Sequence, residues 1–146
     1  MIIAFTGYAG AGKSAAAKIL VENGWTRAKF AAPLKNMLRS LLHDQGVIPE
    51  LIEEMIEGRL KESPSPLLNG RTPRHAMQTL GTEWGRNLIG DSLWVSAAMR
   101  GFSGPTVFDD CRFENEAAAI RAAGGIVMEI RRPGVGPVNA HASENL

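Results

Sequence analysis

The stretch Gly7-Tyr8-Ala9-Gly10-Ala11-Gly12-Lys13-Ser14 matches the phosphate-binding loop pattern, a glycine and four variable positions followed by Gly-Lys-Ser or Gly-Lys-Thr. It follows a short apolar run, residues 1–6, that is typical of a buried strand. It precedes a helix expected over residues 14–23 and ended by Gly24. The alternative is an ordinary turn rich in glycine and alanine. The strand and helix around the loop favour a site for a nucleotide.

The chemistry of phosphate binding explains these residue types. Glycines let backbone N–H groups surround phosphate oxygens, and the N-terminus of the following helix adds partial positive charge. Lys13 can then reach the β and γ phosphates of a nucleoside triphosphate, and the Ser14 hydroxyl can ligate the Mg²⁺ that bridges them. The loop therefore predicts ATP and Mg²⁺ as cofactors.

The composition indicates one compact enzyme domain. The chain has 146 residues, 45% of them hydrophobic, and a formal net charge of +1. Its scattered Lys and Arg residues give no support to a nucleic-acid-binding surface. No apolar run approaches the roughly 20 residues that a membrane span requires, and the N-terminus lacks the basic segment of a signal peptide. The lone Cys111 suits a reducing compartment, so we expect a cytoplasmic protein.

Segments typical of strands and helices alternate along the chain, which predicts an α/β fold with a parallel sheet covered by helices. After the first strand and helix, the pattern predicts further strands over residues 25–30, 106–108 and 126–130. We expect helices over residues 32–43, 49–60, 91–100 and 113–123, and one from Thr72-Pro73 toward Arg86. The tail from residue 131 is typical of a loop.

The helix that begins at Pro73 has two contrasting faces. At about 100° per residue, Ala76, Met77, Leu80 and Trp84 share an apolar face that we expect in the core. The opposite face carries one Arg, one amide, one hydroxyl and two glycines, which favours close approach by a ligand; its residues are Arg74, Gln78, Gly81, Thr82 and Gly85. The alternative is a weak surface helix interrupted by glycine.

Charged residues follow the third and fourth predicted strands. Asp110 lies at the C-terminal end of a strand, where it can hold Mg²⁺ directly or through water, or simply cap the next helix. Arg112 and Glu116 can form a surface ion pair, but their closeness to Asp110 favours a role in the site. Arg131 and Arg132 precede a run rich in Gly and Pro and can neutralise a transferring phosphoryl group, or only decorate the end of a strand.

Several of these motifs together resemble the phage-type deoxynucleoside monophosphate kinases of the P-loop kinase superfamily. The resemblance spans nearly the whole chain, and its most specific parts are residues 81–86 (Gly-Thr-Glu-Trp-Gly-Arg) and 110–116 (Asp-Cys-Arg-Phe-Glu-Asn-Glu). The other matching segments are 7–13, 30–35, 72–78, Trp94 and 141–144. The resemblance implies a three-layer P-loop kinase fold in a single domain, residues 1–146. A helical substrate-binding insertion is expected at about residues 32–100, and a lid at about residues 131–146.

The resemblance also implies a set of site residues. ATP is expected at loop positions Gly10, Ala11, Gly12, Lys13, Ser14 and Ala15, and the metal at Ser14 and Asp110. The residues expected to promote catalysis are Lys13, Asp110, Arg112, Arg131 and Arg132. The deoxynucleoside monophosphate is expected at Arg74, His75, Gln78, Gly81, Thr82, Trp94, Asp110, Arg112 and Glu116.

Two features depart from the family pattern. The family loop commonly reads Gly-Ser-Gly-Lys-Asp-Thr, so Ala11 and Ala15 lack two hydroxyl contacts and Ser14 takes the magnesium role. The family chain also continues past residues 141–144 into another strand and helix, so this chain is expected to be truncated or to lack an edge strand.

The resulting expectation is transfer of the ATP γ-phosphoryl group to a deoxynucleoside monophosphate, in the host cytoplasm if the protein is phage-encoded. The partner is a small-molecule substrate, with no nucleic acid and no membrane, and the oligomeric state stays open, a homodimer being one option. One alternative is a kinase of another small metabolite, such as dephospho-coenzyme A, with Asp110 as the base for a hydroxyl acceptor. Another is a nucleotide-binding switch.

Overall fold

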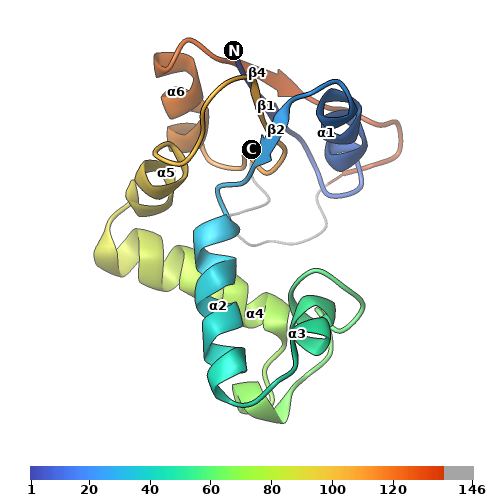
Figure 1. Ribbon diagram of the computed structural model, residues 1–146, viewed down its shortest axis with the longest axis vertical. Helices are drawn as coiled ribbons and strands as arrows, with labels where there is room; N and C mark the ends of the chain where they lie inside the picture. The colour runs from blue at the N-terminus through green and yellow to red at the C-terminus, as the bar shows by residue number, and fades with distance from the viewer. Residues whose placement is uncertain (137–146) are drawn as a thin grey trace. The chain divides into compact units, whose positions relative to one another are not determined.

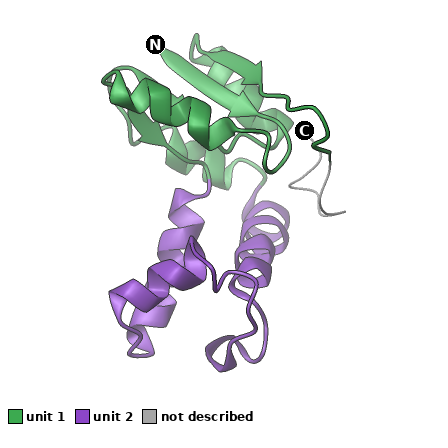
Figure 2. Cartoon of the chain, turned by 90° about the vertical axis from the view of Figure 1, so that its right-hand side faces the viewer, with its two compact units in different colours: residues 1–30, 91–146 green, residues 31–90 purple. Residues whose placement is uncertain are grey.

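The computed structural model describes residues 1–136, which divide into two compact units (Figure 2). Unit 1 contains residues 1–30 and the described residues from 91 onward, and unit 2 contains residues 31–90. The insertion expected at about 32–100 thus extends ten residues beyond unit 2. Residues 137–146 of the expected lid, which include His141, lie outside the described residues.

Unit 1 is built on a four-stranded parallel sheet with the order β2-β3-β1-β4. Its strands are β1 (Ile2–Thr6), β2 (Thr26–Ala28), β3 (Thr106–Phe108) and β4 (Ile126–Glu129). Its helices are α1 (Lys13–Glu22), α5 (Leu93–Ala98) and α6 (Glu114–Ala122) (Figure 1). The α/β class with a parallel sheet, predicted from the alternating segments, is confirmed.

The two faces of this sheet belong to two separate cores, because successive side chains of a strand point to opposite faces. On one face, Phe5 and Val107 pack with Ala17 of α1. On the other face, Ala4 and Phe108 pack with residues of α5 and α6. Helices therefore cover both faces of the sheet, which gives three layers. Strands β3 and β1 are central, and β2 and β4 are the edge strands among the described residues.

Unit 2 is helical. It contains α2 (Ala32–Asp44), α3 (Pro49–Ile56), the short 3₁₀ turn η1 (Pro66–Leu68), α4 (Pro73–Thr79) and the π-helix η2 (Leu80–Ile89). Leu34, Leu38 and Leu42 recur every four residues along α2 and are buried, whereas Met37 and Leu41 of the same helix are exposed. The expected start at Thr72-Pro73 is confirmed, since Thr72 Oγ1 accepts a hydrogen bond from the His75 N–H at 3.0 Å.

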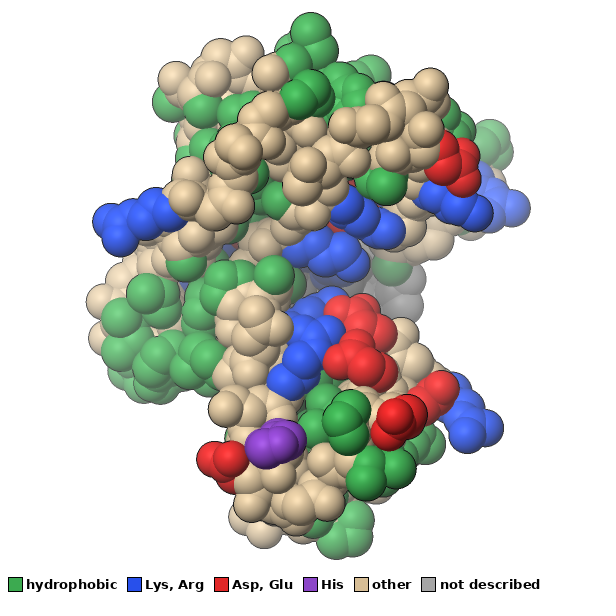
Figure 3. Space-filling model, in the orientation of Figure 1, with side chains coloured by type: hydrophobic (Ala, Val, Ile, Leu, Met, Phe, Trp, Pro, Cys, Tyr) green, Lys and Arg blue, Asp and Glu red, His purple; other side chains and the backbone are tan. Residues whose placement is uncertain are grey.

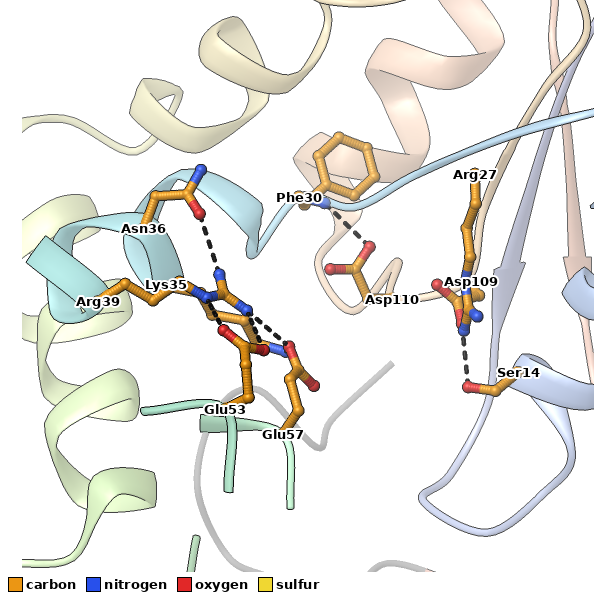
Figure 4. A network of polar contacts seen from close by, with 10 residues as sticks. All are labelled: Ser14, Arg27, Phe30, Lys35, Asn36, Arg39, Glu53, Glu57, Asp109 and Asp110. Carbon is orange, nitrogen blue, oxygen red and sulfur yellow. Dashed lines mark hydrogen bonds and ion pairs between the residues drawn. The ribbon is translucent and has the colours of Figure 1, made fainter. Parts of the chain in front are cut away.

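Helices α2 and α3 are also joined by a cluster of ion pairs, drawn at the left of Figure 4. Lys35 bonds Glu57 at 2.6 Å, and Arg39 bonds Glu53 at 2.7 Å. The hydrogen bond from Arg39 holds the pKa of Glu53 below its usual range. Figure 3 shows basic and acidic side chains next to each other on the lower part of the drawn face. Because these pairs are partly exposed, each contributes at most about 1 kcal/mol.

The second half of the helix that begins at Pro73 differs from the expectation. From Leu80 the backbone is a π-helix, in which the N–H of one residue bonds the carbonyl five positions earlier; the Gly90 N–H, for example, bonds Gly85 O at 2.9 Å. The wider turn changes which residues share a face. Trp84, expected in the core, is therefore 37% exposed, whereas Arg86 is buried.

No helix in the described part of the chain combines the length and apolar character that a membrane crossing needs.

Candidate functional site

The phosphate-loop sequence joins β1 to α1 and adopts a shape that requires glycine. Gly7 has φ +126°, and a Cβ built there would lie 2.3 Å from the backbone oxygen of Ile130, just after β4. Gly12 has φ +107° and immediately precedes α1. Both conformations are strained for any residue with a side chain. The loop is thus held against the carboxyl ends of the central strands.

Lys13 lies at the first position of α1 and is 9% exposed. Its ammonium group donates hydrogen bonds to the carbonyl oxygens of Gly7 and, at 2.8 Å, of Tyr8. The sequence predicts an ammonium group directed at phosphate; in the structure this group lies across the loop, because the loop carbonyls accept its hydrogen bonds. The cation is nevertheless within the loop that is expected to receive the phosphates.

Asp109, a residue not assigned from the sequence, is the acidic centre of the site. Its Oδ2 atom accepts a hydrogen bond from the Ser14 hydroxyl at 3.0 Å and forms an ion pair with Arg27 (Figure 4). Its Oδ1 atom is buried and has no hydrogen-bond partner. Burial alone would raise the pKa of Asp109, but the hydrogen bond from Arg27 and the charges of Lys29 and Arg27 outweigh it and lower the pKa. The carboxyl group is therefore ionised at neutral pH.

The alternation of the strand explains why Asp109, and not Asp110, meets Ser14. Asp109 is two residues beyond Val107 and shares the face covered by α1. Asp110 is two residues beyond Phe108, on the face covered by α5 and α6, and its Oδ1 accepts a hydrogen bond from the Phe30 N–H at 2.9 Å. The structure thus pairs Ser14 with Asp109, whereas Asp110 bonds the Phe30 N–H; the predicted metal role of Ser14 and Asp110 stays a prediction.

The residues present fit a magnesium ion. Mg²⁺ prefers hard oxygen ligands and usually takes only one or two carboxylates, with phosphate oxygens and waters as the rest. The Ser14 hydroxyl and the Asp109 carboxylate supply such oxygens, and the unpartnered Oδ1 atom is an acceptor that a metal-bound water would satisfy. Within residues 1–136, no cluster of three or more His, Cys, Asp or Glu side chains is placed to hold a metal by itself.

The segment that follows Asp110 is fixed by Glu116. This residue is 3% exposed, and its Oε2 atom accepts hydrogen bonds from the backbone N–H groups of Arg112, at 2.7 Å, and Phe113, at 3.0 Å. Glu116 therefore caps α6 and sets the position of the Arg112 backbone. Cys111, between Asp110 and Arg112 in the sequence, lies in the core, where burial raises the pKa of its thiol to about 12.

The residues predicted to bind the substrate are divided between the units. Arg74 of α4 forms an ion pair with Glu62, and its backbone N–H donates to Lys61 O at 3.0 Å. A Cβ on Gly81 would lie 3.2 Å from the Leu34 side chain, so its bare face packs on α2. The remaining members of this set in unit 2 are the exposed His75 and the partly buried Gln78 and Thr82.

Three further predicted residues belong to unit 1. Trp94 of α5 is buried, with 5% of its surface exposed. Arg131 and Arg132 follow β4 and are exposed, and Arg131 bonds Glu129 at 2.7 Å. Their roles stay predictions.

A parallel sheet with helices on both faces, a glycine loop between β1 and α1, and an ionised aspartate bonded to the loop serine define a P-loop kinase-like protein. No family model matches the chain. A protein of Acanthamoeba polyphaga mimivirus, named "Putative deoxynucleotide monophosphate kinase", is 31% identical over 162 aligned positions, which cover 99% of this chain and 80% of the viral protein. The chain belongs to the family of this viral protein.

Proposed function

We propose that the protein is a deoxynucleoside monophosphate kinase, which transfers the γ-phosphoryl group of ATP to the 5′-phosphate of a deoxynucleoside monophosphate. The observation that carries the kinase chemistry is the bond from the Ser14 hydroxyl to Asp109, beside the loop that contains Lys13. The acceptor is supported by the name of the mimivirus relative and by the motifs at residues 81–86 and 110–116.

The donor nucleotide is assigned to residues 10–15. Backbone N–H groups of this loop bind the phosphates, and Lys13 moves its ammonium from the carbonyls of Gly7 and Tyr8 to the β and γ phosphates. Ser14 and Asp109 are proposed to hold Mg²⁺, Asp109 directly or through water. Mg²⁺, when bound, neutralises phosphate charge during transfer. Arg27 keeps the Asp109 carboxylate ionised and directed toward Ser14.

The acceptor is assigned to the residues that the sequence predicts for it. Arg74 and Arg112 suit its phosphate, because a guanidinium group contacts two phosphate oxygens at once. Gln78 suits a base edge or a sugar hydroxyl. The other proposed contacts are His75, Gly81, Thr82, Trp94, Asp110 and Glu116. An ionised acceptor phosphate needs no strong base, so positioning and charge neutralisation supply the catalysis, with Arg131 and Arg132 as further proposed cations.

A coupled assay of ADP release tests the proposal. It is run with each of the four deoxynucleoside monophosphates, with their ribose counterparts and with dephospho-coenzyme A, with and without Mg²⁺. We expect strong stimulation by at least one deoxynucleotide, and only when Mg²⁺ is present. Stimulation by dephospho-coenzyme A alone would assign a different kinase, and slow hydrolysis that responds to no acceptor would assign a nucleotide switch.

A further inference from the structure

The face of the sheet covered by α1 carries an excess of positive charge at its carboxyl edge. Trp25 packs in the core on this face, whereas Ala28 and Phe30 pack in the core on the other. Alternation along β2 and its continuation therefore directs Arg27 and Lys29 to the α1 face, and the ion pair of Arg27 with Asp109 agrees. Two cations, Arg27 and Lys29, thus act on the Asp109 carboxylate.

Lys29 differs from the other two cations in its surroundings. It is partly buried, and its charge acts on the Asp109 carboxylate without an ion pair between them. Both Oδ2 bonds of Asp109 are made by Ser14 and Arg27, and Asp110 lies on the opposite face with the Phe30 N–H. Lys29 is therefore a cation on the α1 face, next to Asp109, at the edge of the sheet where phosphate groups are expected.

We propose that Lys29 contacts the phosphoryl group in transit; this rests on the kinase function proposed above. In that reaction an oxygen of the acceptor phosphate supplies the electron pair of the new P–O bond. The bond from the γ phosphorus to its bridging oxygen breaks, and that electron pair stays on the β-phosphate of ADP. The Lys29 ammonium group stabilises the negative charge of the transferring group. Lys29 directly follows strand β2, so its positive charge lies at the sheet. Arg131, the alternative cation, is exposed and forms an ion pair with Glu129.

The test compares Lys29→Met with Lys18→Met. Lys18 is an exposed lysine of α1 that pairs with Glu22 and serves as the matched control. Two readouts accompany turnover. One is the affinity for MgADP, and the other is the affinity for a bisubstrate analogue in which adenosine and a deoxynucleoside are joined by five phosphates, both measured by calorimetry. The melting temperature of each variant is recorded as well.

For Lys29→Met we expect kcat/KM and analogue affinity to fall by about tenfold or more, with MgADP affinity within about twofold of wild type. Lys18→Met should match wild type in all readouts. The proposal would be overturned if Lys29→Met bound the bisubstrate analogue as tightly as wild type does. It would also be overturned if the variant lost equal affinity for MgADP and for the analogue. If Lys29→Met melts at a lower temperature than wild type, Lys29→Gln is measured instead. The same criterion then applies to it, namely a loss of affinity for the analogue that exceeds the loss for MgADP. A wild-type protein without deoxynucleotide-dependent turnover would instead refute the proposed function.

Discussion

Replacing each of the two adjacent aspartates by asparagine tests the proposal that Asp109, and not Asp110, holds Mg²⁺. Asp109→Asn removes the charge next to Ser14 but keeps the size of the side chain and an oxygen that can accept the serine hydroxyl. We expect turnover to fall on the order of a hundredfold, with a higher Mg²⁺ concentration needed for half-maximal rate. Asp110→Asn keeps an acceptor for the Phe30 N–H and should not change the Mg²⁺ requirement.

The stability change follows from the burial of the Asp109 pair. Removing one partner of a fully buried ion pair costs about 3–5 kcal/mol, but Arg27 is 34% exposed and can turn toward water, so we expect about 1–2 kcal/mol. Because the folded-state pKa of Asp109 is lowered, its contribution is complete above the unfolded pKa of about 3.9 and is lost as the pH falls through the lower folded value. Asp109→Asn should therefore lose less stability on acidification than wild type.

Urea unfolding between pH 2 and pH 7 measures these free energies, and the coupled ADP assay at graded Mg²⁺ concentrations measures the metal requirement. Asp110 is also a proposed substrate contact, and a loss at that position would raise the KM for the acceptor instead. If Asp110→Asn raised the Mg²⁺ requirement more than Asp109→Asn does, the assignment of the metal to Asp109 would be refuted.

Four further predictions concern the remaining site residues. Lys13→Ala should leave the fold intact and reduce turnover to below about a tenth of wild type, since a lost charge contact in the transition state is worth several kcal/mol; a folded, active variant would remove the loop assignment. Arg74→Ala and Gln78→Ala should raise the KM for the deoxynucleotide far more than the KM for ATP, and a change for ATP alone would show that this helix face is misassigned. Arg112→Lys keeps the charge but loses the planar group, so kcat/KM should fall at least about tenfold at an unchanged melting temperature, whereas wild-type kinetics would place Arg112 outside the site. Glu116→Gln should lower the free energy of unfolding by about 1–2 kcal/mol, because its buried carboxylate accepts two backbone N–H groups, and urea unfolding at neutral pH checks this.

The sequence predicts those parts of the fold that depend on residues close together in the chain. The glycine loop, its flanking strand and helix, and helix α2 are set by residues close together in the chain, and each lies in the segment where the sequence predicts it. The helix start at Thr72 was likewise predictable, because one hydroxyl and one proline define it.

The choice between Asp109 and Asp110 was beyond local patterns. Both follow the same strand, and only the packing of Val107 and Phe108 into opposite cores shows which carboxylate meets α1. Arg27 was missed for a similar reason, since its partner is 82 residues away. The exposure of Trp84 could not be predicted from a 3.6-residue period, because the backbone there forms a π-helix. The roles of the predicted substrate residues stay predictions.

The discontinuity of unit 1 has a consequence for how the chain folds during synthesis. Strand β1 is made first, but its partners are far away in the sequence: Ile2 pairs with Thr106, and Ile3 pairs with Ile126. At about 5–20 residues per second, the apolar segment of β1 waits on the order of ten seconds for its neighbours. Unit 2 is contiguous, so all of its residues are available earlier. The nascent chain therefore carries an unpaired, aggregation-prone strand while its helical unit forms. Slow refolding is the expected sign of the long-range pairing, and a yield that falls with protein concentration is the expected sign of aggregation.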